Sequence, residues 1–183
     1  MASRRFNPSG GATGRAPVHH HRIVVIASTV GALVESAGGF LCDRARQGWD
    51  VGVLLRRHCD ARPLSILGVS DHAMLDDDVA SGIETLAPGA TLLICADLFV
   101  GDGGVQRELV RRAAQGRDTV TVCGRPTDTD VTQGLELMPH TPSAAATAFK
   151  TSALRAAHIE AAGEPVEELY RLRGAAFRRL RAV

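Results

Sequence analysis

Short apolar runs and longer amphipathic stretches alternate along most of the chain. The run His21–Ser28 is rich in β-branched residues, which is typical of a strand buried on both faces. Apolar side chains then recur at helical spacing as far as Ala45. Ser28 or Thr29 is placed to cap this helix and Gly48 to end it. Val51–Leu55 predicts the next strand, so the chain opens as strand, helix, strand.

The same alternation continues through the middle of the chain. Strands are predicted at Leu64–Val69, Ala90–Ala96 and Thr119–Gly124, and helices at Asp78–Leu86 and Val105–Gln115. Alternating strands and helices imply right-handed crossovers and parallel pairing. The predicted fold is therefore α/β: a Rossmann-like, three-layer architecture with a mostly parallel sheet and helices on both faces, plus C-terminal helices.

The C-terminal third changes character. Pro139–Pro142 predicts a break, and Ser143–Ala162 is rich in alanine and predicts a helix. A second helix is predicted over residues 164–182, with an apolar stripe edged by arginines. The expected organisation is a disordered N-terminal tail at residues 1–20, an α/β core at 21–140, and a C-terminal helical segment at 141–183 packed on the core.

The composition indicates a globular protein and argues against nucleic-acid-binding and membrane-spanning proteins. The 183 residues carry a net charge of +1 and are 45% hydrophobic and 22% charged, as in globular proteins. Near-neutrality argues against nucleic-acid binding, and no apolar run reaches the roughly 18 residues of a membrane span. The four cysteines form no CxxC pair, which favours reduced thiols and a cytoplasmic location.

Polar residues gather where the predicted strands end. In an open parallel sheet, ligands bind outside the carboxyl ends of the strands. Weak catalytic candidates at such ends are Asp71, His72, Asp97 and Asp102, which as a group suit a divalent metal, a polyol or general-base chemistry. The alternative is that these residues cap helices and form turns.

Four stretches, in order, resemble the PIG-L/LmbE family of zinc-dependent sugar N-deacetylases. Arg22–Leu55 resembles the family's first strand, metal-binding turn, glycine-containing helix and second strand, with Gly38, Gly39 and Gly48 on the family's glycines. The other three stretches are Leu67–Val69, Leu86–Ala114 and Phe149–His158. The resemblance covers roughly three-quarters of the chain and implies the same fold.

The resemblance also implies a divergent member that lacks the family's metal-binding motifs. The family's His-Pro-Asp-Asp-Glu turn corresponds to Thr29–Leu33, and Asp102 and Gly103 fall on the last two positions of its His-Pro-Asp-His loop. A catalytic zinc needs about three protein ligands. We therefore expect zinc, the family's cofactor, to be absent, with no metal-binding residue. The positions matching the family's site loops are instead candidates for ligand binding: Ser28, Thr29, Gly31 and Gly103.

Two functions follow from these expectations. The first is a non-catalytic PIG-L-like domain, a pseudoenzyme that binds a protein partner or a small ligand. Its C-terminal helix 164–182 would then form a homodimer or another protein interface. The second is an active hydrolase, resembling an N-deacetylase, that uses a different set of residues at the carboxyl edge of the sheet.

Overall fold

The computed structural model describes residues 21–57, 60–75, 78–127, 132, 134–160 and 165–173. Within these residues the chain forms one seven-stranded sheet in the order β3-β2-β1-β4-β5-β7-β6. The strands are β1 (Arg22–Ala27), β2 (Asp50–Leu55), β3 (Asp71–Met74), β4 (Thr91–Cys95), β5 (Thr119–Cys123), β6 (Leu135–His140) and β7 (Glu167–Leu172). The expected tail at residues 1–20 lies outside the described residues.

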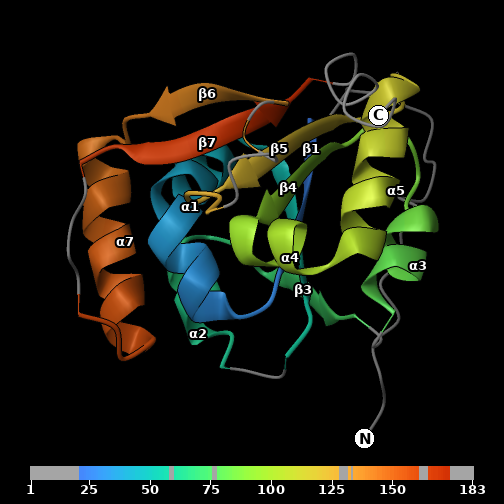
Figure 1. The fold of residues 1–183 in the computed structure, drawn as a ribbon. Helices are drawn as coiled ribbons and strands as arrows, with labels where there is room; N and C mark the ends of the chain where they lie inside the picture. The colour runs from blue at the N-terminus through green and yellow to red at the C-terminus, as the bar shows by residue number, and fades with distance from the viewer. Residues whose placement is uncertain are drawn as a thin grey trace, which may run out of the picture.

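Helices cover both faces of the sheet, as Figure 1 shows. They are α1 (Val30–Arg46), α2 (Arg62–Ile66), α3 (Val79–Glu84), α4 (Ala96–Gly101), α5 (Gly103–Ala114) and α7 (Ala144–Ala156). Helices α1, α2 and α7 pack with one hydrophobic cluster, and α3, α4 and α5 with the other. The first five strands pair in parallel, while β7 runs antiparallel to both β5 and β6. The predicted α/β, three-layer, mostly parallel fold is confirmed.

Strand β1 shows why the β-branched run forms the centre of this sheet. Ile23 and Val25 face one hydrophobic cluster, whereas Val24 and Ile26 face the other. All four are nearly inaccessible to solvent. Because successive side chains of a strand point to opposite faces, a strand in the middle layer needs apolar residues at every position.

The predicted third strand at Leu64–Val69 is wrong. Arg62–Ile66 forms the short helix α2, with Pro63 in its first turn and Leu64 buried in the core. Proline suits the start of a helix because it has no N–H to leave unsatisfied. The strand lies further along, at Asp71–Met74, and pairs in parallel with β2.

The predicted helix at 164–182 is also wrong over Glu167–Leu172, which forms β7 inside the sheet. Leu169 faces the cluster beneath α1, and Leu172 faces the opposite cluster. Apolar residues three apart fit a helix, but they equally fit a strand buried on both faces. Among the described residues after 140, the chain therefore supplies one helix packed on the core, α7, and one strand of the sheet. The part of the predicted helix at 174–182 lies outside the described residues.

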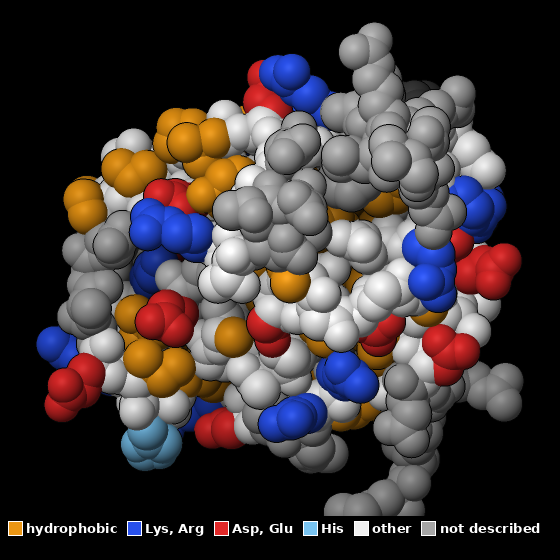
Figure 2. Space-filling view, in the orientation of Figure 1, with side chains coloured by type: hydrophobic (Ala, Val, Ile, Leu, Met, Phe, Trp, Pro, Cys, Tyr) orange, Lys and Arg blue, Asp and Glu red, His pale blue; other side chains and the backbone are white. Residues whose placement is uncertain are grey.

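Strand β6, the antiparallel partner of β7, was not predicted because Pro139 suggested a break. Proline is tolerated in an edge strand, where its missing N–H can point away from the partner. Leu137 and Met138 on β6 are 54% and 36% exposed. In Figure 2, hydrophobic side chains gather at the upper left, over β6 and β7, while charges of both signs are scattered across the rest of this face.

No helix among the described residues combines the length and the apolar character needed to cross a membrane.

Candidate functional site

A cleft opens at the carboxyl edge of the sheet, where the direction of the crossovers reverses. From β1 the chain proceeds outward to β2 and β3, whereas β4 and β5 lie on the other side of β1. This reversal is the position at which open α/β sheets bind ligands. The cleft has a volume of about 400 Å³ and is lined by Ser28, Thr29, Ala32, Arg56, Arg57, Asp97, Leu98 and Gly101. We call it the switch-point cleft.

The turn from β1 into α1 forms one wall of the cleft. Thr29 has extended backbone angles and caps α1, its hydroxyl accepting a hydrogen bond from the Ala32 N–H at 3.2 Å. Ser28 precedes the cap, and its hydroxyl donates to the carboxylate of Asp97. Asp97 lies in the first turn of α4, directly after β4. The tight turns after these adjacent parallel strands therefore bring two of the sequence-predicted residues, Ser28 and Asp97, into direct contact.

Two arginines at the end of β2 form a second wall. The Arg56 N–H donates to the carbonyl of Ala27 at 3.0 Å, which extends the pairing of β1 and β2 by one residue. Arg56 and Arg57 are both exposed and both line the switch-point cleft. Sequence reasoning did not single them out. The available signal was their position directly after a predicted strand.

The four catalytic candidates are divided among three places. Asp97 contacts Ser28 in the switch-point cleft. Asp102 caps α5, its carboxylate accepting from the N–H groups of Gly104 and Val105 at 3.0 and 3.2 Å. Asp71 and His72 begin β3 and pair with Gly52 and Val53, which lie two to three residues before the carboxyl end of β2. The predicted carboxyl-edge position of Asp71 and His72 is therefore wrong, because their strand starts later than expected.

The two glycines among the ligand-binding candidates have different surroundings. Gly31, in the first turn of α1, lies beneath Ile159, which follows α7. A Cβ atom at Gly31 would lie 2.8 Å from the Ile159 Cδ1 atom. Gly103 begins α5 beside the side chain of Arg107. The apolar Ile159 side chain therefore occupies the space into which a side chain at position 31 would project.

A second polar cluster, also missed from sequence, lies where β7 meets the middle of α1. Glu167 is 3% exposed, and its carboxylate accepts from the backbone N–H groups of Gly39 and Phe40 at 2.8 and 2.7 Å. Lys150 of α7 donates to the same carboxylate at 2.6 Å. A Cβ atom at Gly39 would lie 2.5 Å from Pro142, so the absence of a side chain is what allows this close approach.

An exposed ion pair lies beside that cluster. Arg125, just after β5, bonds Glu168 of β7 through two nitrogens at 3.0 and 2.7 Å. This hydrogen bonding, together with a bond from the Tyr170 hydroxyl, lowers the pKa of Glu168 to about 2. The Glu168 carboxylate is thus held in its charged form well below the ordinary range.

The side chains of the switch-point cleft do not fit a zinc ion. Among the described residues that line it there is one carboxylate, that of Asp97, and no imidazole or thiolate. A structural or catalytic zinc is held by about three such groups, and the two guanidinium groups present would repel a divalent cation. Across the part of the chain that the structure describes, no three His, Cys, Asp or Glu side chains are grouped to hold a metal.

Comparison with known proteins identifies the fold. No protein-family model matches the chain, and no curated protein matches it significantly. Among solved structures, a deacetylase in complex with teicoplanin, from the teicoplanin biosynthesis pathway, superposes with a TM-score of 0.58 at 13% identity. The matched region covers 83% of this chain and 98% of that one.

A second similar structure is the A40926 pseudoaglycone deacetylase, with a TM-score of 0.53, 15% identity, and coverage of 84% of this chain and 97% of that one. The zinc-inhibited form of teicoplanin deacetylase gives 0.51 at 12% identity, with coverage of 82% and 97%. This chain therefore has the LmbE-like deacetylase fold that the resemblance in its sequence implied. At these identities the likeness establishes the fold alone.

Proposed function

We propose that the chain is a non-catalytic domain on a deacetylase fold and that it binds a small polar ligand in the switch-point cleft. The observation that carries the proposal is the position of the cleft at the topological switch point together with its lining. The described lining residues offer hydroxyl, carboxylate and guanidinium groups.

The chemistry of the lining indicates the kind of ligand. Arg56 and Arg57 present guanidinium groups, whose fork of N–H donors matches a carboxylate or phosphate. Across the cleft, Asp97 can accept hydrogen bonds from ligand hydroxyl or amino groups, as it already accepts one from Ser28. A small molecule with hydroxyl groups and one anionic group would use both walls. A phosphorylated amino sugar has these features.

The residues present also support the absence of deacetylase chemistry. Zinc would supply an activated water for amide hydrolysis in the resembling family. The positions matching the family's first metal-binding turn, Thr29–Leu33, cap and begin α1. Within that turn Gly31 is covered by Ile159. None of these side chains is a strong metal ligand, so this turn does not supply the zinc site that amide hydrolysis needs.

The binding test is a thermal-shift and calorimetric titration of the full chain with glucosamine 6-phosphate, and with glucosamine at the same ionic strength. A ligand at 100 times its dissociation constant stabilises a protein by about 2.7 kcal/mol, which a melting curve detects. We expect Arg56→Gln and Ser28→Ala to weaken binding. Arg155→Gln, an exposed arginine on α7, is the matched control and should leave binding unchanged. Equal binding by the wild type and by Arg56→Gln would refute the assignment of the cleft.

The non-catalytic part of the proposal has its own assay. The purified chain, incubated with excess zinc and N-acetylglucosamine derivatives, should release no acetate above a buffer blank. Acetate release that depends on zinc and on Asp97 would contradict it, whatever the outcome of the binding titration.

One observation favours the alternative of an active hydrolase, namely the contact of the Ser28 hydroxyl with the Asp97 carboxylate in an open cleft. A carboxylate in this position can take a proton from a hydroxyl nucleophile. The test is hydrolysis of an activated ester such as p-nitrophenyl acetate. Loss of activity in both Ser28→Ala and Asp97→Asn would support this alternative, and a wild-type rate equal to the buffer rate would exclude it for such esters.

A further inference from the structure

Two cysteines end neighbouring strands at the carboxyl edge of the sheet. Cys95 is the last residue of β4 and Cys123 the last residue of β5, and the two are direct partners in the parallel register. Their Sγ atoms lie 3.7 Å apart, and both residues are free thiols. Their side chains therefore point to the same face of the sheet, with the sulfur atoms in contact.

A route from solvent leads close to one of the two sulfurs. The Ser36 hydroxyl of α1 lies 3.5 Å from Cys123 Sγ. Ser36 and Gly124, the residue after Cys123, line a second cleft of about 230 Å³ between α1, α7 and β7. Ser36 therefore contacts both this cleft and the sulfur of Cys123. Cys123 itself is 1% exposed and Cys95 2%, so a solute reaches either sulfur only after local movement of the side chains that cover it, Ser36 among them.

The two thiols have different surroundings. Contact with Cys123 and burial raise the pKa of the Cys95 thiol well above its ordinary value. A thiol that keeps its proton is a poor nucleophile towards peroxides, because the thiolate is the reactive form. Because Cys123 is the one of the two that contacts Ser36 at the second cleft, it is placed to react first, with Cys95 reacting second as the resolving thiol.

We infer that Cys95 and Cys123 form a redox-active dithiol that a hydroperoxide converts into a disulfide between β4 and β5. In the first step the Cys123 sulfur attacks the peroxide, the O–O bond breaks, and the products are a sulfenic acid and water. In the second step the Cys95 sulfur attacks this sulfenic acid, the S–S bond forms, and a second water leaves. Two thiols are thereby oxidised by two electrons and one hydrogen peroxide is reduced to two waters. The inference stands independently of the proposed ligand.

The sheet geometry predicts that this disulfide is reducible. Neighbouring strands lie about 4.8 Å apart, within the range of about 4.4–6.8 Å between the Cα atoms of a disulfide. The Cβ atoms of a disulfide approach to about 3.8 Å, closer than two paired strands normally bring them. The bond therefore strains the ladder, and strained disulfides are the ones that small dithiols reduce readily.

The test treats the full-length folded chain with stoichiometric hydrogen peroxide, blocks the remaining thiols under denaturing conditions, and maps the peptides by mass spectrometry. We expect a loss of two hydrogen atoms and one linked peptide pair joining Cys95 to Cys123, both reversed by dithiothreitol. The same treatment of the chain unfolded in urea should give mixed linkages among all four cysteines, because only the fold brings this pair together. Absence of the Cys95–Cys123 link in the folded protein would overturn the inference.

Single substitutions distinguish the thiol that reacts with peroxide, Cys123, from the resolving thiol, Cys95. Cys95→Ser should form no intramolecular link and should accumulate a Cys123 sulfenic acid that a 1,3-dicarbonyl reagent traps. Cys123→Ser should lose this reactivity, and Cys42→Ser should retain the link. Cys42 is as buried as the pair, with 2% exposure, which makes it the matched control. Equal trapping at Cys42 and Cys123 in the folded chain would also contradict the inference, since it would show no selectivity for the paired site.

Discussion

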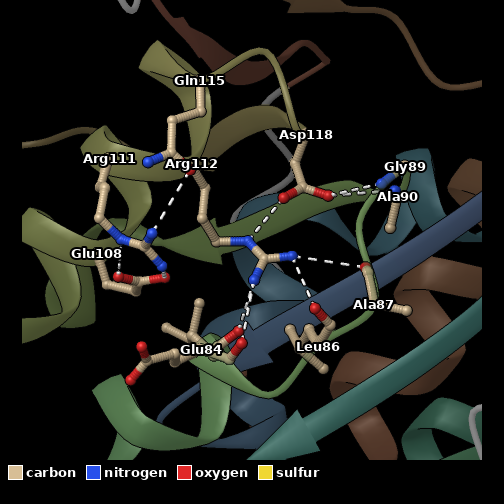
Figure 3. A network of polar contacts seen from close by, with 11 residues as sticks. Glu84, Leu86, Ala87, Gly89, Ala90, Glu108, Arg111, Arg112, Gln115 and Asp118 are labelled. Atoms are coloured by element: carbon tan, nitrogen blue, oxygen red, sulfur yellow. Dashed lines mark hydrogen bonds and ion pairs between the residues drawn. The ribbon is translucent and has the colours of Figure 1, made fainter.

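A buried arginine on α5 gives the sharpest prediction about stability. The side chains of Arg112 and Asp118 are both inaccessible to solvent, and Arg112 Nε bonds Asp118 Oδ2 at 2.6 Å. The remaining guanidinium nitrogens donate to the backbone carbonyls of residues 83, 84, 86 and 87, as Figure 3 shows. Asp118 in turn accepts from the N–H groups of Gly89 and Ala90 at 3.1 and 3.2 Å. This pair therefore ties the connection between α3 and β4 to the end of α5.

Replacing Asp118 by asparagine keeps the shape of the side chain and one oxygen for the two backbone N–H groups, but it removes the charge that balances Arg112. Removing one member of a buried ion pair costs about 3–5 kcal/mol, because the other charge stays buried without compensation. The stability of a whole domain is about 5–15 kcal/mol. We expect Asp118→Asn to lower the free energy of unfolding by about 3–5 kcal/mol, a large part of the total.

The measurement is urea unfolding at neutral pH for the wild type, Asp118→Asn, Arg112→Met and the double variant. The double variant should lose much less than the sum of the two single variants, because neither charge is left alone. Arg111→Met is the control on the same helix. Arg111 pairs with Glu108 but is 40% exposed, so its loss should have a much smaller effect. A loss below about 1 kcal/mol for Asp118→Asn, or an additive double variant, would refute the reasoning.

Three further predictions concern other contacts. Gly39→Ala should lower the free energy of unfolding by about 1–3 kcal/mol, because the new methyl group would lie 2.5 Å from Pro142. An unchanged midpoint of urea unfolding would contradict this prediction. Asp102→Ala should cost about 1 kcal/mol in the same assay through loss of the α5 cap, with restoration by Asp102→Ser as the check. Because the pKa of Glu168 is lowered from 4.5 to about 2, its contribution to stability should be complete above about pH 4.5 and be lost as the pH falls towards 2. Arg125→Gln should reduce this acid dependence, leaving only the part due to the Tyr170 hydroxyl, and NMR titration of the Glu168 carboxyl would show this directly.

Local patterns in the sequence predicted most of the parallel core. A β-branched run such as Ile23–Ile26 needs burial on both faces, and a capped amphipathic stretch such as Val30–Arg46 needs one face against a sheet. Each of these patterns is contained in one short stretch of sequence, so the strand and the helix can be predicted without knowing the rest of the molecule. The same local reasoning placed Ser28, Thr29 and Asp97 at the ends of their strands.

The tertiary structure alone decided which elements of the C-terminal third join the sheet and which polar groups meet. Glu167–Leu172 has apolar spacing that suits either a helix or a doubly buried strand, and its pairing with β5 and β6 selects the strand. Three contacts join residues that belong to different elements and are well separated along the sequence: Ser28–Asp97, Lys150–Glu167 and Cys95–Cys123. Local propensity carries no information about such distant pairs, because the strand order and register that create them arise only when the whole sheet packs.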